Sequence, residues 1–250
     1  MTTRRNTWAV EINHVDLRRP VTSERPIRIA AQPQHITLDI RRTALLVIDM
    51  QNDFCHPDGW LAGIGVDIAG ARRPIQVLEQ LLPYARTSEI PVVWVNWGNR
   101  PDRANIPPGV LHVYDPAGAG TGIGTPSNAA NSPVLQAGSW SSSIVDELAP
   151  GPGDVLVDKY RMSGFTDTPL DSILRNLRVD TVLFAGVNAD QCVLATLMDA
   201  ANLGYDVVML SDAAGTTSPQ FCMDATIYNV RQCFGFTATS SDLIAALDSL

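Results

Sequence analysis

Short apolar runs alternate with stretches of helical periodicity along most of this chain. The runs predict strands, because a parallel strand is buried on both faces and its sequence is continuously hydrophobic. The stretches between them repeat apolar residues at spacings of three and four, which predicts amphipathic helices. The predicted strands are 44–48, 92–96, 154–159, 182–185, 206–210 and 234–239, and the predicted helices are about 67–88, 142–148, 168–178, 192–203, 220–232 and 242–247.

This alternation indicates the fold class. Strands separated by single helices connect through right-handed crossovers into a parallel sheet that carries helices on both faces. We therefore expect an α/β protein, a three-layer α/β/α sandwich around a six-stranded parallel sheet, built by one domain over residues 41–250.

Two segments lack both periodicities. Residues 1–40 contain six arginines and several prolines, and we expect an N-terminal arm that is disordered or lies across a neighbouring subunit. Residues 97–140 are rich in Gly, Pro and Asn, and a loop of this length is often a functional lid or an interface element. Its GAGTGIG run lacks the preceding strand and following helix of a phosphate-binding loop, so we expect no nucleotide there.

Composition narrows the partners. The net charge of −8 argues against nucleic acid and anionic membranes, which leaves a small-molecule substrate. No apolar window reaches the roughly 18 residues of a membrane span, and the N-terminus has no secretory signal, so we expect a cytoplasmic protein. Four cysteines without C-x-x-C spacing indicate neither a disulfide framework nor a zinc site. The low charged fraction of 18%, the arm and the long loop favour a homodimer or homotetramer.

Three reactive side chains follow predicted strands. Asp49, Lys159 and Cys192 each stand at the carboxyl end of a strand, and these ends meet at the ligand-binding edge of an open α/β sheet. Cys192 also begins a predicted helix, where the helix dipole and a neighbouring lysine are expected to lower the pKa of the thiol. Asp49 can then take the thiol proton and return it to a leaving amine. Together they predict acyl transfer by a cysteine nucleophile.

Each of these residues also has an ordinary explanation on its own. Asp49 could cap a helix, Lys159 could be a surface cation, and Cys192 could be a small buried apolar residue. Their coincidence at one sheet edge favours the catalytic interpretation. The four histidines lie in the arm or in loops, so a Cys-His pair is less favoured, and only His56 remains an alternative base.

The same motifs resemble the isochorismatase-like cysteine hydrolases. The resemblance runs from Thr43 to the C-terminus and is carried by ALLVIDMQNDF, VDKYRMSGF and GVNADQCVLAT. It implies an isochorismatase-like (Rossmann-like) fold with Asp49, Lys159 and Cys192 as catalytic residues. It also implies a cis peptide at Val187-Asn188 and an oxyanion hole formed by the backbone N–H groups of Asn188 and Cys192.

Within this family the chain is most similar to the ureidoacrylate amidohydrolase and biuret-type hydrolase branch. The segments DELAPGPGDVLVDKYRMSGFTDTPLDSILRNL and YNVRQCFGF carry this similarity. True isochorismatases lack the cysteine, and the metal-binding histidines of nicotinamidases have no counterpart in VNWGNRPD, so we expect neither a metal nor another cofactor. The branch reads GIATNVCVEST where this chain has GVNADQCVLAT, so Asn188 and Gln191 depart from it.

The predicted function is hydrolysis of a C–N bond in a small ureido or carbamoyl compound, such as ureidoacrylate, biuret, triuret or an N-carbamoyl compound, with release of ammonia or an amine. Two alternatives stay open: an isochorismatase-like hydrolase of a different small amide, and a non-catalytic oligomeric interaction module with the same fold. Predicted substrate contacts are the residues that closely follow catalytic elements and have side chains suited to a pocket, namely Phe54, Asn96, Tyr160, Phe165 and Gln191.

Overall fold

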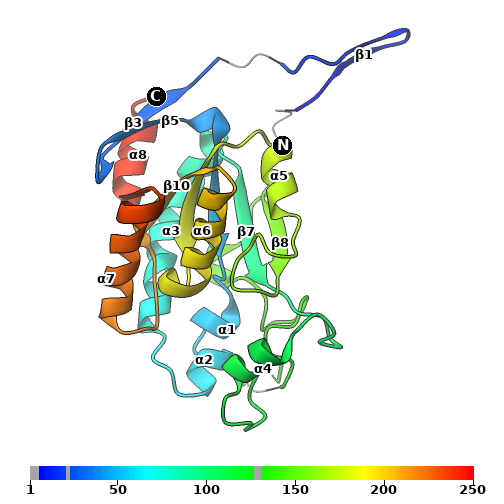
Figure 1. The fold of residues 1–250 in the computed structure, drawn as a ribbon, viewed down its shortest axis with the longest axis vertical. Coiled ribbons are helices and arrows are strands. Elements are labelled where there is room, and N and C mark those ends of the chain that lie inside the picture. Colours follow the sequence, from blue (N-terminus) through cyan, green and yellow to red (C-terminus); the bar gives the residue numbers. More distant parts are fainter. Residues whose placement is uncertain (1–5, 21–22, 127–130) are drawn as a thin grey trace.

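A seven-stranded sheet forms the centre of the computed structural model, which describes residues 6–20, 23–126 and 131–250 (Figure 1). The strand order is β4-β11-β10-β9-β6-β7-β8. Six of these strands are parallel, as the sequence predicts, and the α/β class is confirmed. The parallel strands are β6 (Thr43–Ile48), β7 (Val92–Trp97), β8 (Val155–Lys159), β9 (Thr181–Gly186), β10 (Asp206–Ala214) and β11 (Phe236–Ala238).

Helices cover both faces of the sheet. The helices α3 (Ala69–Thr87) and α8 (Ser240–Asp248) pack on one face, whereas α5 (Leu170–Asn176), α6 (Leu194–Asn202) and α7 (Gln220–Asn229) pack on the other (Figure 1). Alternate residues of β6 belong to the two cores: Leu45 and Val47 face α3, while Ala44, Leu46 and Ile48 face α6. This explains why the strand is apolar at every position after Thr43, since neither face meets water.

The seventh strand corrects the expectation of six. It is β4 (Ala31–Gln32), which comes from the segment expected as an arm and pairs antiparallel with β11. The same segment forms a hairpin of β3 (Pro26–Ile29) and β5 (Ile36–Asp39), in which Ile27 and Ile29 join the core beside α8. The alternate apolar residues of β3 therefore pack this part of the chain onto the domain.

The rest of the expected arm is a second hairpin. Its strands β1 (Ala9–Glu11) and β2 (His14–Asp16) stand away from the body of the protein (Figure 1). Residues 1–5 and 21–22 of the expected arm lie outside the described residues.

The long segment 97–140 contains one helix, α4 (Pro108–Tyr114), and residues 127–130 of it lie outside the described part. The short helices α1 (Asn52–Cys55) and α2 (Trp60–Gly63) lie with α4 at one end of the sheet (Figure 1). Asp53 joins these elements, because its carboxylate accepts the N–H of Trp60 at 3.1 Å and that of Leu135 at 2.8 Å. The segment is therefore fastened over the carboxyl ends of the strands.

The expected helix over 142–148 is only one 3-10 turn, η2 (Asp146–Leu148). Ser142 and Ser143 both donate their hydroxyls to the carbonyl of Ser139, at 3.2 and 3.0 Å. Serine hydroxyls that bond nearby backbone groups compete with helix formation, which accounts for the shorter element.

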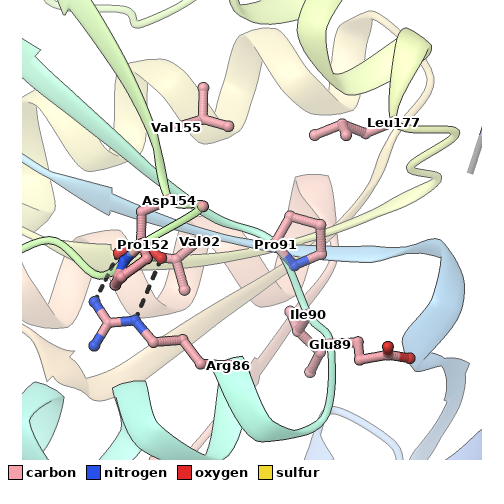
Figure 2. A pocket seen from close by; sticks show the side chains of 10 residues that line it. Arg86, Glu89, Ile90, Pro91, Val92, Pro152, Asp154, Val155 and Leu177 are labelled. Atoms are coloured by element: carbon pink, nitrogen blue, oxygen red, sulfur yellow. Dashed lines mark hydrogen bonds and ion pairs between the residues drawn. The ribbon is translucent and has the colours of Figure 1, made fainter. Parts of the chain in front are cut away.

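An ion pair closes the opposite end of the sheet. Arg86 at the end of α3 binds Asp154 with Nη2–Oδ2 at 2.6 Å (Figure 2). The indole of Trp94 donates to the same oxygen at 2.9 Å. A cavity of about 250 Å³ lies among Arg86, Asp154 and the first residues of β7 and β8. The ion pair ties α3 to the sheet.

No helix in the described ranges is long and apolar enough to cross a membrane.

Candidate active site

Asp49 follows β6 directly and turns the chain out of the sheet. Its φ is 52°, in the left-handed region that a non-glycine residue seldom adopts. Its N–H still donates to Val95 O at 2.9 Å, and Gln51 N–H donates to Asp49 O at 2.8 Å, so the backbone is held on both sides of the bend. The carboxylate is buried at the carboxyl edge of the sheet.

Lys159 is the last residue of β8 and its side chain is fully buried. The ammonium Nζ lies 2.8 Å from Asp49 Oδ2 and donates to Cys192 Sγ at 3.2 Å and to Arg161 O at 3.2 Å. It also lies 4.6 Å from the centre of the Trp97 ring, in the geometry of a cation–π contact. A lysine with these four partners is no surface cation.

Cys192 follows β9 after a tight turn. The Val187-Asn188 peptide is cis, and Cys192 lies in a single π-helical turn, η3 (Ala189–Val193), that continues into α6. Gly186 allows the turn to pass close to β6, since its φ is 111° and an added Cβ would lie 2.1 Å from Ile48 O. The thiol therefore points at the lysine, and its sulfur also contacts Met162 Sδ at 3.7 Å.

The structure thus brings Asp49, Lys159 and Cys192 into direct contact, although they come from three different strands. Lysine is the central member, because its one ammonium group contacts both the carboxylate and the sulfur. His56 does not belong to this group: its ring packs edge-on against Trp140, and its Nδ1 accepts the N–H of Asp58.

Burial controls the protonation of these groups. It raises the pKa of the Cys192 thiol to about 12, with Lys159 opposing and Asp49 adding to the rise. Burial also raises the pKa of Asp49, against the attraction of Lys159. For Lys159, burial favours proton loss, but attraction to Asp49 and Cys192 outweighs it and raises the pKa. At neutral pH the thiol therefore keeps its proton, and Lys159 remains an ammonium group beside Asp49.

This protonation state corrects one expectation. The cation and the helix start were expected to lower the pKa of the thiol, but dehydration of the sulfur and the nearby carboxylate outweigh the lysine. Asp49, whose own pKa is raised, is correspondingly a stronger base than an ordinary carboxylate. A reaction that used the sulfur as a nucleophile would need a base to take the thiol proton, and Asp49 is an adjacent candidate.

The predicted substrate contacts occupy different surroundings. Asn96 is buried in β7, and its Oδ1 has no hydrogen-bond partner in the described part of the chain. Phe54 is buried in the core within α1. Tyr160 is half-buried and donates its hydroxyl to Asp167 O at 3.1 Å. Phe165 packs against Tyr205, with ring centres 5.9 Å apart, and the exposed Gln191 donates to Ser218 Oγ at 3.3 Å.

Of these five, only Asn96 presents a buried polar atom that is left for a ligand. Phe165 packs against the core cluster that includes Cys192 and Val95, and its ring also contacts Tyr205, which precedes β10. A substrate role for all five residues stays a prediction.

An aromatic stack beside the lysine has no counterpart among the predicted residues. Tyr114, at the end of α4, lies 5.1 Å from both the Trp60 and the Trp97 rings, measured between ring centres. Burial, reinforced by the nearby acidic groups of Cys192 and Asp49, raises the pKa of Tyr114 well above its usual value, so its hydroxyl remains a donor. The position of Trp97 at the end of a strand could have indicated a residue near the site. No sequence pattern indicates the same for Tyr114.

The site offers no ready metal cage. Within residues 6–20, 23–126 and 131–250, no three His, Cys, Asp or Glu side chains gather so as to hold a metal ion. The buried acceptor Oδ1 of Asn96 and the buried donor Nε1 of Trp97 each lack a hydrogen-bond partner in those ranges. A buried polar atom without a partner is a candidate contact for a polar ligand.

Known proteins of similar sequence are amidohydrolases. The isochorismatase domain matches residues 43–242 of this chain. The ureidoacrylate amidohydrolase RutB of Rhizobium rhizogenes strain K84 is 36% identical over 229 residues, which cover 91% of this chain and 92% of that protein. RutB of Agrobacterium fabrum strain C58 is 36% identical over 228 residues, with 88% and 96% covered.

Solved structures show the same architecture. A cysteine hydrolase from Pseudomonas syringae pv. phaseolicola 1448A superposes with a TM-score of 0.72 and 25% identity, covering 91% of this chain and 99% of that one. N-carbamoylsarcosine amidase from Thermoplasma acidophilum superposes with a TM-score of 0.61 and 27% identity, covering 80% and 96%. With a domain match over most of its length and relatives above 30% identity along nearly their whole chains, this protein belongs to the isochorismatase family.

Proposed function

We propose that the protein is an amidohydrolase that cleaves a C–N bond of a small ureido or carbamoyl compound, with Cys192 as its nucleophile. The observation that carries this proposal is the buried contact set in which Lys159 Nζ lies 2.8 Å from Asp49 Oδ2 and 3.2 Å from Cys192 Sγ. A thiol, a base and a fixed cation in one dry site are the parts that nucleophilic acyl transfer requires.

The first half-reaction forms an acyl enzyme. Cys192 Sγ bonds to the carbonyl carbon while its proton passes to Asp49, and Lys159 stabilises the negative charge that develops on sulfur. The C–N bond then breaks as Asp49 gives that proton to the leaving nitrogen, which departs as ammonia or an amine. Because the resting thiol is protonated, Asp49 acts as base before it acts as acid.

The second half-reaction restores the enzyme. A water molecule attacks the thioester carbon and gives a proton to Asp49, the C–S bond breaks, and the departing sulfur recovers the proton. No redox change occurs in either half. One molecule of water is consumed for each C–N bond cleaved.

The turn before Cys192 suits an oxyanion hole. The N–H groups of Val187 and Ala189 already donate to Ile48 O at 2.9 Å and Gly215 O at 2.7 Å. We assign the oxyanion hole to the backbone N–H groups of Asn188 and Cys192, as the resemblance to the family implies. Removing one such donor typically slows an acyl transfer about 100- to 1,000-fold.

The substrate class follows from both chemistry and resemblance. The buried Asn96 Oδ1, which lacks a hydrogen-bond partner among the described residues, can accept an N–H group of the kind that a urea-like compound offers. The relatives named ureidoacrylate amidohydrolase and N-carbamoylsarcosine amidase also act on carbamoyl compounds. The negative net charge does not favour nucleic acid or membranes as partners.

The exposed apolar side chains of the β1–β2 hairpin support a homodimer or homotetramer. Val10, Ile12 and Val15 are 71%, 100% and 42% exposed, and apolar side chains gathered on one exposed hairpin are typical of a protein interaction surface. Light scattering on the purified protein would decide the mass of the assembly.

The experiment is an ammonia-release screen with ureidoacrylate, biuret, triuret and N-carbamoylsarcosine. Cys192→Ala and Cys192→Ser should lose turnover, and the wild type should show an acyl adduct on Cys192 by mass spectrometry. Cys222→Ser, which changes a half-buried thiol on α7, is the matched control and should remain active. Full turnover by Cys192→Ala, or an adduct on Cys55, would refute the mechanism, and a wild type inert on the whole panel would favour another amide or a non-catalytic interaction module.

A further inference from the structure

The turn that precedes the nucleophile is bound by side chains to the loop that follows β10. Thr217 N–H donates to Asn188 Oδ1 at 3.2 Å, and Asn188 Nδ2 donates back to Thr217 Oγ1 at 3.3 Å. Next to this reciprocal pair, Thr216 donates its hydroxyl to Asp190. Three positions of the turn, counting Gln191 and its bond to Ser218, are thus held by three consecutive residues of one loop.

The loop itself has a firm base. Gly215 O accepts the N–H of Ala189, and an added Cβ on Gly215 would lie 2.3 Å from Gly70 O, at the start of α3. A Cβ on Gly70 would likewise lie 2.0 Å from Thr216 O. Backbones that approach this closely leave no room for side chains between them, so the loop is packed against the start of α3. The turn before Cys192 is bonded to this packed loop.

These contacts change the meaning of the departures from the branch motif. The amide side chains of Asn188 and Gln191 suited a planar ureide when judged from the sequence alone. In the structure Asn188 is half-buried and bonds Thr217 with both ends of its carboxamide, and its Nδ2 also donates to Gln191 Oε1 at 3.4 Å. Gln191 is exposed and donates to Ser218. Neither amide bonds Cys192.

We infer that Asn188 and Thr217 form a positioning pair that fixes the backbone N–H of Asn188 for the oxyanion. The inference rests on the proposed function, since it assigns a support to the proposed oxyanion hole. The carboxamide and the N–H belong to one residue, so a two-point anchor on the side chain restricts rotation of the peptide that carries the N–H. Such restriction matters because displacement of a catalytic group by about 1 Å can slow a reaction 100-fold.

The test compares four variants with the wild type. Asn188→Ala removes both bonds to Thr217 and the weaker one to Gln191, Thr217→Val removes only the hydroxyl acceptor, and Thr217→Ser keeps it. Thr237→Val is the matched control, because it removes a threonine hydroxyl that accepts from Arg231 Nε at 2.7 Å on strand β11 and makes no bond to the turn. For each protein, kcat and KM are measured with the panel compound that the wild type hydrolyses fastest. The rate of Cys192 alkylation by iodoacetamide is measured in parallel.

We expect kcat to fall about 10- to 100-fold in Asn188→Ala and by less in Thr217→Val, with KM changed less than about threefold. Thr217→Ser and Thr237→Val should match the wild type. Alkylation of Cys192 should stay within about twofold in all variants, because displacement of iodide develops no oxyanion and does not use the hole.

Three results would overturn the inference. A kcat of Asn188→Ala close to the wild type would show that the pair positions nothing. A rise in KM alone would make Asn188 a substrate contact, and a parallel loss of alkylation would mean that the pair merely preserves the surroundings of the thiol. If Cys192→Ala abolishes activity while the pair variants do not, the inference fails and the proposed function stands; a wild type inert on the panel removes both.

Discussion

Replacing the buried lysine tests the electrostatics of the site most directly. Lys159→Met keeps the length and apolar stem of the side chain but removes its charge from between Asp49 and Cys192. At an effective dielectric constant of about 20, unit charges at the Nζ–Oδ2 separation of 2.8 Å attract by about 6 kcal/mol. Dehydration of both ions offsets part of this attraction, so the measurable effect is the cost of leaving Asp49 unpaired.

Asp49 should respond by keeping a proton. Burial already raises the pKa of Asp49, and loss of the lysine removes the strongest influence that lowers this pKa. A protonated Asp49 cannot accept the thiol proton, and a general base is typically worth about 100- to 10,000-fold in rate. We therefore expect Lys159→Met to lose at least about 1,000-fold in kcat/KM, and about 3–5 kcal/mol in free energy of unfolding at pH 7.

A double-mutant cycle separates the two effects. Lys159→Met, Asp49→Asn and the double variant are compared by urea unfolding and by ammonia release. The double variant buries two neutral groups, so it should recover much of the stability that Lys159→Met loses, while all three variants remain inactive. Additive losses of stability would show that the two charges do not interact, and more than a tenth of wild-type activity in Lys159→Met would refute the assigned role of the lysine.

Three further predictions concern pH and backbone packing. The kcat/KM should fall as the pH drops through the pKa of Asp49, because only the ionised carboxylate accepts the thiol proton. Burial raises this pKa above the ordinary value of 3.8, so a pH–rate profile with its acid limb below 3.8 would contradict the buried pair. Gly186→Ala should lower the free energy of unfolding by at least about 2 kcal/mol in urea, since its Cβ would meet Ile48 O. Burial opposes ionisation of Asp154, but hydrogen bonds, led by the one from Arg86, outweigh burial and lower its pKa. The ionised carboxylate therefore stabilises the fold above the unfolded pKa of about 3.9, and this stabilisation is lost as the pH falls through the lower folded pKa. Asp154→Asn should accordingly melt below the wild type at pH 7, with the gap closing in acid, and a gap independent of pH would rule out the charge as the cause.

Local pattern alone determined the main architecture. The runs at β6 and β9 are apolar at every position after the initial threonine because both faces of those strands are covered, so the strands could be recognised without any knowledge of their neighbours. The rule that parallel strands share one carboxyl edge then placed Asp49, Lys159 and Cys192 together, and the structure brings them into contact. The family followed from the same motifs and is confirmed by the domain match.

Tertiary structure decided what depends on neighbours distant in sequence. The antiparallel edge strand β4 is two residues long, which is too short to be predicted from hydrophobic periodicity. Tyr114 reaches the lysine's surroundings through a segment without pattern, held by Asp53 and the aromatic stack.

The protonation of Cys192 shows the difference most clearly. The position of Cys192 at a strand end and beside a cation could be predicted from the sequence. The pKa of its thiol depends mainly on how completely the sulfur is dehydrated. Dehydration is a property of the packed site, to which every surrounding element contributes. The sequence therefore determined which groups meet at this edge of the sheet, and burial in the folded protein decided which of them carries the proton.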